Sequence, residues 1–262
     1  MLLKGMVSVL TGSGRINSIG AATARLLARN GSHVVINCLN SKEQAEKVVS
    51  ECSSYGVSSE LFVGDITNTE TCKSLATFVK DKFGRVDTIV NCVGATKPAS
   101  YENLELLNAA DFMKLFSVNV IGPYLMAQAF QSMLRESKIA SIVNVSSTAA
   151  LTGISSSIAY ATSKGAENSL TLALAQALSP EVRVNAVCPS FVDSSWWETP
   201  FKDKKDKYEA LVESMKEKNL LKRVIKPEDV ALTILSVIQN PVMTGEIIRL
   251  DAGAHIGKSN SR

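Results

Sequence analysis

Short apolar runs alternate along the chain with longer stretches of helical periodicity. The apolar runs, which predict strands, lie at 6–10, 33–36, 60–63, 86–90, 139–145, 182–187 and 246–250. The stretches that predict helices lie at 20–30, 41–55, 68–83, 109–135, 156–178 and 227–239. Strands that alternate with helices form right-handed βαβ units and a parallel sheet. The pattern therefore predicts a doubly wound α/β fold over residues 1–262, with a mostly parallel seven-stranded sheet and helices on both faces.

Several helix boundaries carry their own signals. Ser41 and Asn68 are suitable N-cap residues, and Pro227 suits the first turn of the last helix. Gly31 and Gly84 follow helical stretches and suit their C-terminal ends. These signals support the helix positions given by the hydrophobic pattern.

The segment 189–220 interrupts the alternation of strands and helices, and its pattern predicts irregular structure. Long irregular segments in compact domains are usually functional, so we expect a substrate lid at about 190–220. Both tryptophans of the chain, Trp196 and Trp197, lie in this segment. Indole rings there suit two roles equally, contact with an apolar substrate or packing of the lid onto the sheet.

Composition excludes several classes of protein. The net charge is only +3 and the basic residues are spread out, so no nucleic-acid footprint is expected. Five cysteines without a C-x-x-C motif indicate reduced thiols, and two distant histidines argue against a metal site. The start of the chain does not resemble a signal peptide, and no apolar run reaches membrane-spanning length. We therefore expect a cytoplasmic protein without metal, nucleic-acid or membrane partners.

The sequence TGSGRINSIG at residues 11–20 follows the first predicted strand. It resembles a phosphate-binding glycine loop, although the common G-x-G-x-x-G fingerprint would need glycine where Asn17 stands. Doubly wound sheets bind ligands outside the carboxyl ends of their strands. The position of the loop therefore favours a cofactor site.

Tyr160 and Lys164 are four residues apart and share one face of a predicted helix. A nearby ammonium lowers the pKa of a phenol, and such a tyrosine can exchange a proton with a carbonyl or alcohol oxygen. Ser147 ends the fifth predicted strand, where its hydroxyl can bind the same oxygen. Taken alone, the Tyr-Lys pair also suits a helix surface, and the serine also suits a strand cap. No G-x-S-x-G motif surrounds Ser147, which argues against a serine hydrolase.

Together these motifs resemble the short-chain dehydrogenase/reductase family, across essentially the whole chain. The similar stretches, in order, are Thr11-Gly12 with Ile19-Gly20, Asp65-Ile66, Asn91-Cys92-Val93-Gly94, Asn119, Ser147 with Tyr160 and Lys164, Pro189 to Ser194, and Asp251-Ala252-Gly253. The resemblance implies a single-domain Rossmann fold and an NAD(P)-dependent enzyme acting on alcohol or carbonyl groups. The chain is most similar to the 3-oxoacyl-carrier-protein reductases, which implies a small-molecule or acyl-thioester carbonyl substrate. Neighbouring branches of the family use sugars, steroids and simple alcohols, and the motifs do not choose among them.

The resemblance also implies a role for each site residue. Tyr160 would be the acid-base group, and Lys164 would lower its pKa and hold the nicotinamide ribose. Ser147 would orient the substrate oxygen, and Asn119 would hold a water between Lys164 and solvent. The expected cofactor contacts are Gly12, Ser13, Arg15, Ser18, Ile19, Gly20, Asn37, Asp65, Ile66, Asn91, Gly94, Tyr160, Lys164, Pro189, Val192 and Ser194.

The chain departs from the family pattern in its glycine loop, which is two residues longer and has Ser18 at the middle glycine position. Such a loop is similar to that of the enoyl reductases of the same superfamily. Those enzymes separate tyrosine and lysine by six residues, and this chain has Glu167 at that place. The carbonyl-reductase branch therefore fits better.

Residues 37–41, at the tip of the second strand, contain no acid, and Arg15 lies in the glycine loop. An acid there would favour NAD, whereas arginine is a good phosphate partner, so we expect NADP(H) in preference to NAD(H). The helices at 109–135 and 156–178 are apolar nearly all round, which predicts a homotetramer or homodimer. The alternative function is a nucleotide-binding regulator or sensor without turnover.

Overall fold

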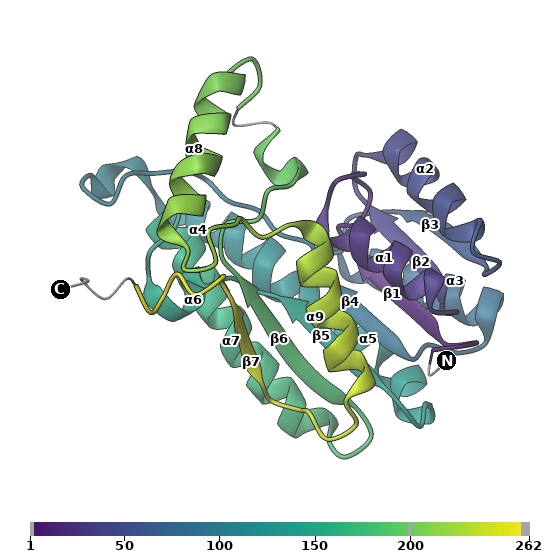
Figure 1. The fold of residues 1–262 in the computed structure, drawn as a ribbon. Helices are drawn as coiled ribbons and strands as arrows, with labels where there is room; N and C mark the ends of the chain where they lie inside the picture. Colours follow the sequence, from purple (N-terminus) through teal and green to yellow (C-terminus); the bar gives the residue numbers. More distant parts are fainter. Residues whose placement is uncertain (1–2, 199–200, 258–262) are drawn as a thin grey trace.

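The computed structural model describes residues 3–198 and 201–257 as a sheet covered by helices on both faces (Figure 1). The strands are β1 (Val7–Thr11), β2 (His33–Cys38), β3 (Ser59–Val63), β4 (Thr88–Asn91), β5 (Ser141–Val145), β6 (Arg183–Pro189) and β7 (Ile247–Leu250). They form one seven-stranded sheet in the order β3-β2-β1-β4-β5-β6-β7. Every neighbouring pair of these strands is parallel, so the expected fold is confirmed and the sheet is wholly parallel.

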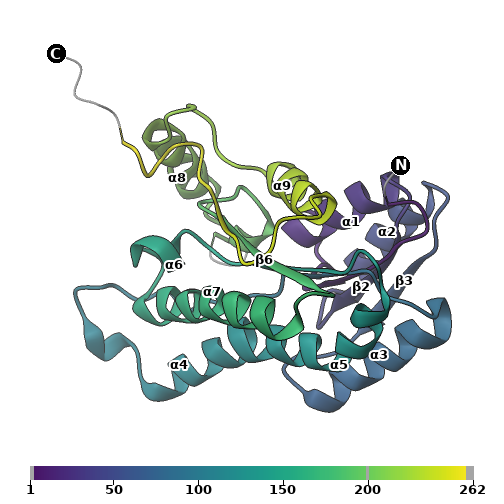
Figure 2. The ribbon, with the colours of Figure 1, turned by 90° about the horizontal axis from the view of Figure 1, so that it is seen from below.

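The helices form two layers (Figure 2). One layer contains α1 (Ile19–Arg29), α2 (Lys42–Ser53) and α9 (Pro227–Gln239), with α1 packed against both of the others. The opposite layer contains α3 (Thr69–Phe83), α4 (Ala109–Phe116), α5 (Gly122–Glu136) and α7 (Ile158–Leu178). Two further helices, α6 (Ala149–Thr152) and α8 (Lys205–Lys218), lie toward the carboxyl ends of the strands.

Successive strand residues face different cores, because side chains alternate across a sheet. Val9 and Val35 belong to the core beneath α3, α5 and α7. Their neighbours Leu10 and Ile36 belong to the core beneath α1, α2 and α9. Since both faces are buried, the strands are continuous apolar runs, as the sequence pattern indicates.

The boundary signals agree well with the structure. The Asn68 side chain caps α3 by accepting a hydrogen bond from the Thr71 N–H. Gly84 ends α3 with a left-handed φ of 69°, and Pro227 is the first residue of α9. Ser41 precedes α2 as expected, but its side chain makes no capping bond to the helix.

The single helix expected over 109–135 is wrong in one respect. A π-helical turn, η2 (Ser117–Ile121), separates α4 from α5. Asn119 lies in this turn with its side chain fully buried. Apolar periodicity does not reveal the interruption, because the turn keeps its apolar residues.

The irregular structure expected over 189–220 is also wrong. We call residues 190–226 the β6–α9 segment, and it contains a 3₁₀ turn, η3 (Ser195–Trp197), as well as α8. No residue of α8 is fully buried, so its apolar stripe is weak. The half-buried residues Tyr208, Leu211, Val212 and Met215 nevertheless follow helical spacing, and that spacing could have predicted the helix.

The chain reverses its direction across the sheet between β1 and β4. Ligands of doubly wound sheets bind at this switch point, beyond the carboxyl ends of the strands. No helix of the described chain is both long enough and apolar enough to cross a bilayer.

Candidate active site

The loops that follow β1 and β4 touch at the switch point. Gly12 follows β1 with a φ of 63°, and a Cβ atom there would lie 2.6 Å from the Val93 Cα. A side chain at Gly12 would therefore collide with the backbone of the neighbouring loop. Glycine therefore lets the two loops approach each other closely at the place where the fold binds ligands.

The rest of the glycine loop is packed with similar closeness. A Cβ at Gly20 would lie 2.1 Å from the Ser13 Oγ, and one at Gly14 would lie 2.3 Å from the Ser41 Oγ. The Ser13 N–H donates to the Asn37 carbonyl at 3.0 Å. The longer loop is therefore a packed structure that joins β1 to the tip of β2.

The N-terminus of α1 ends the loop. Ser18 is the N-cap, and its hydroxyl accepts from the Ala21 N–H at 3.1 Å. The N–H groups of Ile19 and Gly20 have no acceptor within the helix, as at every helix start. The first turn contains no acidic residue. These features favour an anion beside α1.

A row of polar side chains fixes the strand ends below the site. Thr11, Asn91 and Asn144 are aligned across β1, β4 and β5. The Thr11 hydroxyl donates to Asn91, whose amide donates to Asn144 at 2.9 Å. Asn144 donates in turn to Thr171 of α7. The Asn91 side chain therefore joins the strands, and its expected contact with the cofactor stays a prediction.

Tyr160, Ser147 and Lys164 lie together, as the sequence predicts. Ser157 caps α7 by accepting from the Tyr160 N–H, which places the tyrosine in the first turn. The Lys164 ammonium donates to the Val145 carbonyl, two residues before Ser147, which brings α7 to the end of β5. The Ser147 hydroxyl accepts from the Ala149 N–H at 3.1 Å, which orients it.

The pKa of Tyr160 is raised above its ordinary value, chiefly by burial. Lys164 lowers this pKa, Glu167 raises it, and the Ser147 hydroxyl lowers it. Lys164 thus acts in the direction expected from the sequence, but burial outweighs it.

Lys164 is itself held by two buried acceptors. Its Nζ donates to the Val145 carbonyl at 2.9 Å and to the Glu167 Oε2 at 2.7 Å. The Lys164 and Glu167 side chains are 3% and 0% exposed. Sequence reasoning did not include Glu167 in the site. The sequence signal that could have identified Glu167 is an acidic residue one turn after Lys164 in an otherwise apolar helix.

Asn119 connects two elements of the site. Its Oδ1 accepts from the Ala95 N–H at 2.8 Å, and its amide donates to the Ala95 carbonyl at 3.0 Å. The amide also donates to the Ser163 hydroxyl of α7 at 2.9 Å. The π-helical turn therefore joins the loop after β4 to the helix that carries Tyr160 and Lys164.

Other residues expected to contact the cofactor lie near the carboxyl ends of the strands. The side chains of several of them contact other residues of this chain. The exposed Asp65 accepts from the backbone and hydroxyl of Thr67. Ile66 is buried in the core below α5. The buried Asn37 donates to the carbonyls of Phe62 and Gly64.

Pro189, Val192 and Ser194 lie where β6 ends and the β6–α9 segment begins. Pro189 ends the strand, and Val192 bridges to Ile225. Ser194 caps η3 by accepting from the Trp196 N–H. These contacts fix the direction in which the segment leaves the sheet.

The two tryptophans face different surroundings. The Trp196 ring lies 6.3 Å from the Tyr160 ring, centroid to centroid. It also lies against Gly94, where a Cβ would be 3.6 Å from the indole. The Trp197 ring stacks on Phe191 at 5.0 Å, and its Nε1 donates to the Val192 carbonyl. Trp196 therefore faces the site, whereas Trp197 packs the β6–α9 segment.

Comparison with known proteins agrees with this geometry. Residues 12–255 match the family model described as enoyl-(acyl carrier protein) reductase. A putative ketoacyl reductase of granaticin polyketide synthesis from Streptomyces violaceoruber is 32% identical over 95% of this chain and 96% of its own. The chain belongs to the short-chain dehydrogenase/reductase family. It is thus an oxidoreductase, as the sequence predicts.

Solved structures of this family have the same fold. A putative short-chain dehydrogenase/reductase from Burkholderia xenovorans superposes with a TM-score of 0.88 and 34% identity, over 96% of this chain and 98% of its own. An NAD⁺-bound xylitol dehydrogenase superposes with a TM-score of 0.87 and 25% identity, over 97% of this chain and 100% of its own.

The site suits the nicotinamide dinucleotides of the family. Gly12 is exposed at the switch point, where its backbone is accessible to a ligand. The Ile19 and Gly20 N–H groups suit the pyrophosphate, because they point out of a helix start that has no acid. The Lys164 ammonium has three N–H donors, and its two protein contacts leave one for a ribose hydroxyl.

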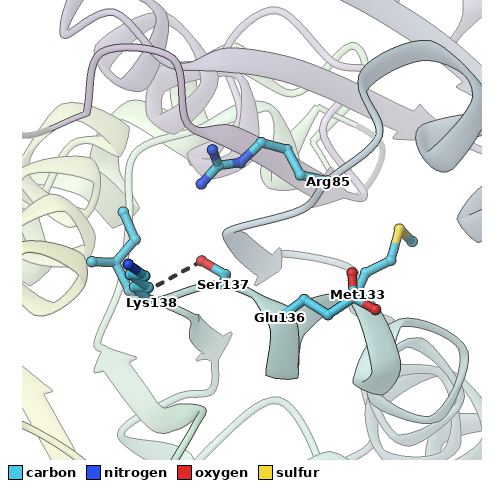
Figure 3. Close-up of a pocket in the computed structure, with 6 residues that line it drawn as sticks. Arg85, Met133, Glu136, Ser137 and Lys138 are labelled. Atoms are coloured by element: carbon cyan, nitrogen blue, oxygen red, sulfur yellow. Dashed lines mark hydrogen bonds between the residues drawn. The ribbon is translucent and has the colours of Figure 1, made fainter.

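A separate hollow lies at the opposite ends of the strands. It is lined by Arg85, Met133, Glu136, Ser137, Lys138 and Ile139 (Figure 3). These residues precede β4 and β5, so the hollow lies at the amino ends of the strands. The candidate active site lies at the carboxyl ends of the strands, so this hollow is not part of it.

Proposed function

We propose that this protein is an NADP(H)-dependent enzyme that interconverts a carbonyl and an alcohol, with a 3-oxoacyl thioester as the substrate class. The observation that carries the proposal is the cluster at the end of β5. The half-buried Tyr160 shares one face of α7 with Lys164, whose ammonium donates to the Val145 carbonyl two residues before Ser147. This group lies beyond β5, at the edge of the sheet where family members bind their ligands.

In carbonyl reduction, the bound nicotinamide cofactor supplies the hydride that reaches the substrate carbon. Tyr160 donates its phenolic proton to the substrate oxygen, and Ser147 donates a hydrogen bond to the same oxygen. The Lys164 ammonium lowers the pKa of Tyr160 and so stabilises the phenolate that remains. In alcohol oxidation, the phenolate accepts the proton instead.

Asn119 acts as a positioning residue in this proposal. Its three hydrogen bonds hold the loop after β4 in register with α7. The water expected between Lys164 and solvent stays a prediction, and its proposed place is beside this π-helical turn.

The preference for NADP(H) rests on the tip of β2. Residues 37–41 offer no carboxylate to repel a 2′-phosphate. Gly14 packs against Ser41 and Cys38, which places the glycine loop beside this tip. Arg15, the next residue, has an exposed side chain and would bind the phosphate.

The acyl substrate is supported by the relatives and by Trp196. The matched family model and the granaticin relative both carry names of enzymes for acyl substrates. In our proposal the β6–α9 segment covers the substrate, and Trp196 provides apolar contact beside Tyr160. The spacing of Tyr160 and Lys164 favours carbonyl over enoyl reduction, because Glu167 stands where enoyl reductases have lysine.

We also propose that the chain forms a homodimer or homotetramer. Met113, Ile121, Tyr124 and Leu172 are exposed on the layer of α4, α5 and α7 in the single chain. Contact with a second copy would bury this apolar surface. Light scattering that gives the mass of one chain would contradict this proposal.

The decisive experiment follows oxidation of NADPH and NADH with a carbonyl panel: a 3-oxoacyl thioester, a cyclic ketone, a quinone and a keto sugar. Tyr160→Phe should reduce turnover by about 100-fold or more, because the proton donor is lost. Tyr55→Phe, in the exposed turn after α2, is the matched control and should retain activity. Full activity in Tyr160→Phe would overturn the assignment. Tight cofactor binding without turnover on the panel would favour the sensor.

A further inference from the structure

Glu167 is a buried acid at the centre of the candidate active site. It lies seven residues after Tyr160 and three after Lys164, so the three side chains share one face of α7. Its Oε2 accepts from the Lys164 ammonium at 2.7 Å. Its Oε1 is buried and has no hydrogen-bond partner in the described part of the chain. Burying a carboxyl group in this way is costly, so Glu167 is poorly explained by stability alone.

The groups around Glu167 come from several elements. Tyr160 and Lys164 belong to α7, Cys92 follows β4, and Cys188 lies in β6. Burial raises the pKa of Cys92 to about 12 and also raises that of Cys188, so both thiols are neutral near pH 7. Among these groups, the charges that act on one another at neutral pH belong to Lys164 and Glu167.

The two charges have opposite effects on Tyr160. Lys164 lowers the pKa of the phenol and Glu167 raises it. Glu167 also raises the pKa of Lys164, which keeps the ammonium charged despite its burial. Burial raises the pKa of Glu167 to about 7, against the influence of Lys164. The charge on Glu167 thus changes near pH 7.

We propose that Glu167 is a positioning residue, which holds the Lys164 ammonium between itself and Val145 and controls by its own charge how strongly Lys164 acts on Tyr160. The proposal rests on the proposed function for the role of Tyr160, but not on the identity of the substrate. Ionised Glu167 weakens the effect of Lys164 on the phenol, and neutral Glu167 leaves that effect at full strength.

The first test compares Glu167→Gln with the unmodified protein. Glutamine keeps an oxygen acceptor for Lys164 but removes the charge. The titration of Tyr160 is followed by tyrosinate absorbance, as the difference between each protein and its Tyr160→Phe counterpart. We expect the midpoint in Glu167→Gln to fall by roughly one pH unit. The alkaline loss of carbonyl reduction should move to lower pH by a similar amount.

Glu181→Gln is the matched control, because it removes a half-exposed acid paired with Arg135 and should leave the Tyr160 midpoint unchanged. Glu167→Asp retains the charge, so the midpoint of its Tyr160 titration should lie close to that of the unmodified protein. A folded Glu167→Gln protein with an unchanged midpoint would overturn the proposal, even if its stability fell. The absorbance titration needs no substrate, so it tests Glu167 independently of the proposed function. An error in the proposed function would instead appear as activity that survives Tyr160→Phe.

A second variant covers the case in which Glu167→Gln does not fold. Lys164→Met removes the cation and leaves Glu167 able to become neutral. Because Lys164 lowers the pKa of Glu167, the ¹³Cδ NMR signal of Glu167 should titrate at least about one pH unit higher in this variant. An unchanged Glu167 midpoint would show that the two charges are not coupled, and would overturn the proposal.

Discussion

Arg15 in the glycine loop donates a hydrogen bond to the Ser195 carbonyl at 3.0 Å, across 180 residues of sequence. The Ser195 N–H donates back to the Asn17 carbonyl at 2.8 Å. Ser195 is buried beneath these contacts. The longer glycine loop therefore holds the β6–α9 segment at the residue next to Trp196.

The first prediction separates two roles of Arg15. The bond to Ser195 uses one of several N–H donors of the guanidinium, which leaves others for a 2′-phosphate. Arg15→Ala should raise the KM for NADPH by about tenfold or more and change that for NADH much less. Arg29→Ala, at the exposed end of α1, should change neither. An equal increase for both cofactors would limit Arg15 to its contact with Ser195.

The second prediction concerns the adjacent tryptophans. Trp197→Ala should lower the free energy of unfolding by about 3 kcal/mol, because the stack on Phe191 and the bond to Val192 are lost. Trp196→Ala should cost less stability but change kcat/KM for acyl substrates, because its ring faces Tyr160. Urea unfolding and steady-state kinetics of both variants test this separation. It would be contradicted if the two variants lost equal stability and equal kcat/KM.

The third prediction concerns Asn119. Asn119→Ala should lower the free energy of unfolding by about 2 kcal/mol, because the Ala95 N–H and carbonyl lose their partner in a buried position. Activity should fall too, since the loop after β4 loses its connection to α7. Asn103→Ala, which removes an exposed cap, should cost less than about 1 kcal/mol. Urea unfolding that gives equal losses for the two variants would contradict this.

The fourth prediction follows from Glu167 and concerns stability against pH. The pKa of Glu167 is raised from 4.5 to about 7, so the folded state binds this proton more tightly than the unfolded state. Its contribution to stability is fully present below pH 4.5 and is lost as the pH rises to about 7. The free energy of unfolding of Glu167→Gln should therefore depend less on pH across this window. If the free energies of unfolding of Glu167→Gln and the unmodified protein changed equally with pH, the prediction would be wrong.

The fold was predictable because most elements carry local signals. The apolar runs gave the strands, and Asn68, Gly84 and Pro227 marked helix boundaries through capping and backbone preferences. The two errors have different physical causes. The π-helical turn is fixed by bonds from Asn119 to Ala95 and Ser163 of other elements, which the hydrophobic pattern does not show. No residue of α8 is fully buried, so its apolar stripe is weak.

The sequence predicted which residues belong to the candidate site, and their cofactor contacts stay predictions. It did not predict that the Asn91 and Asn37 amides bond to neighbouring strands and carbonyls. A sequence motif gives the position of a residue along the chain. The partner of its side chain depends on which strands the topology makes adjacent.

The sequence by itself determined the order of elements and the spacing of Ser147, Tyr160 and Lys164, because periodicity and motifs are local. Only the tertiary structure decided that Trp196 faces Tyr160 while Trp197 faces Phe191, and that Arg15 reaches Ser195. It also decided that Glu167 is buried against Lys164, which makes its charge matter. Electrostatic effects depend on burial and distance, and both are fixed when distant segments pack together.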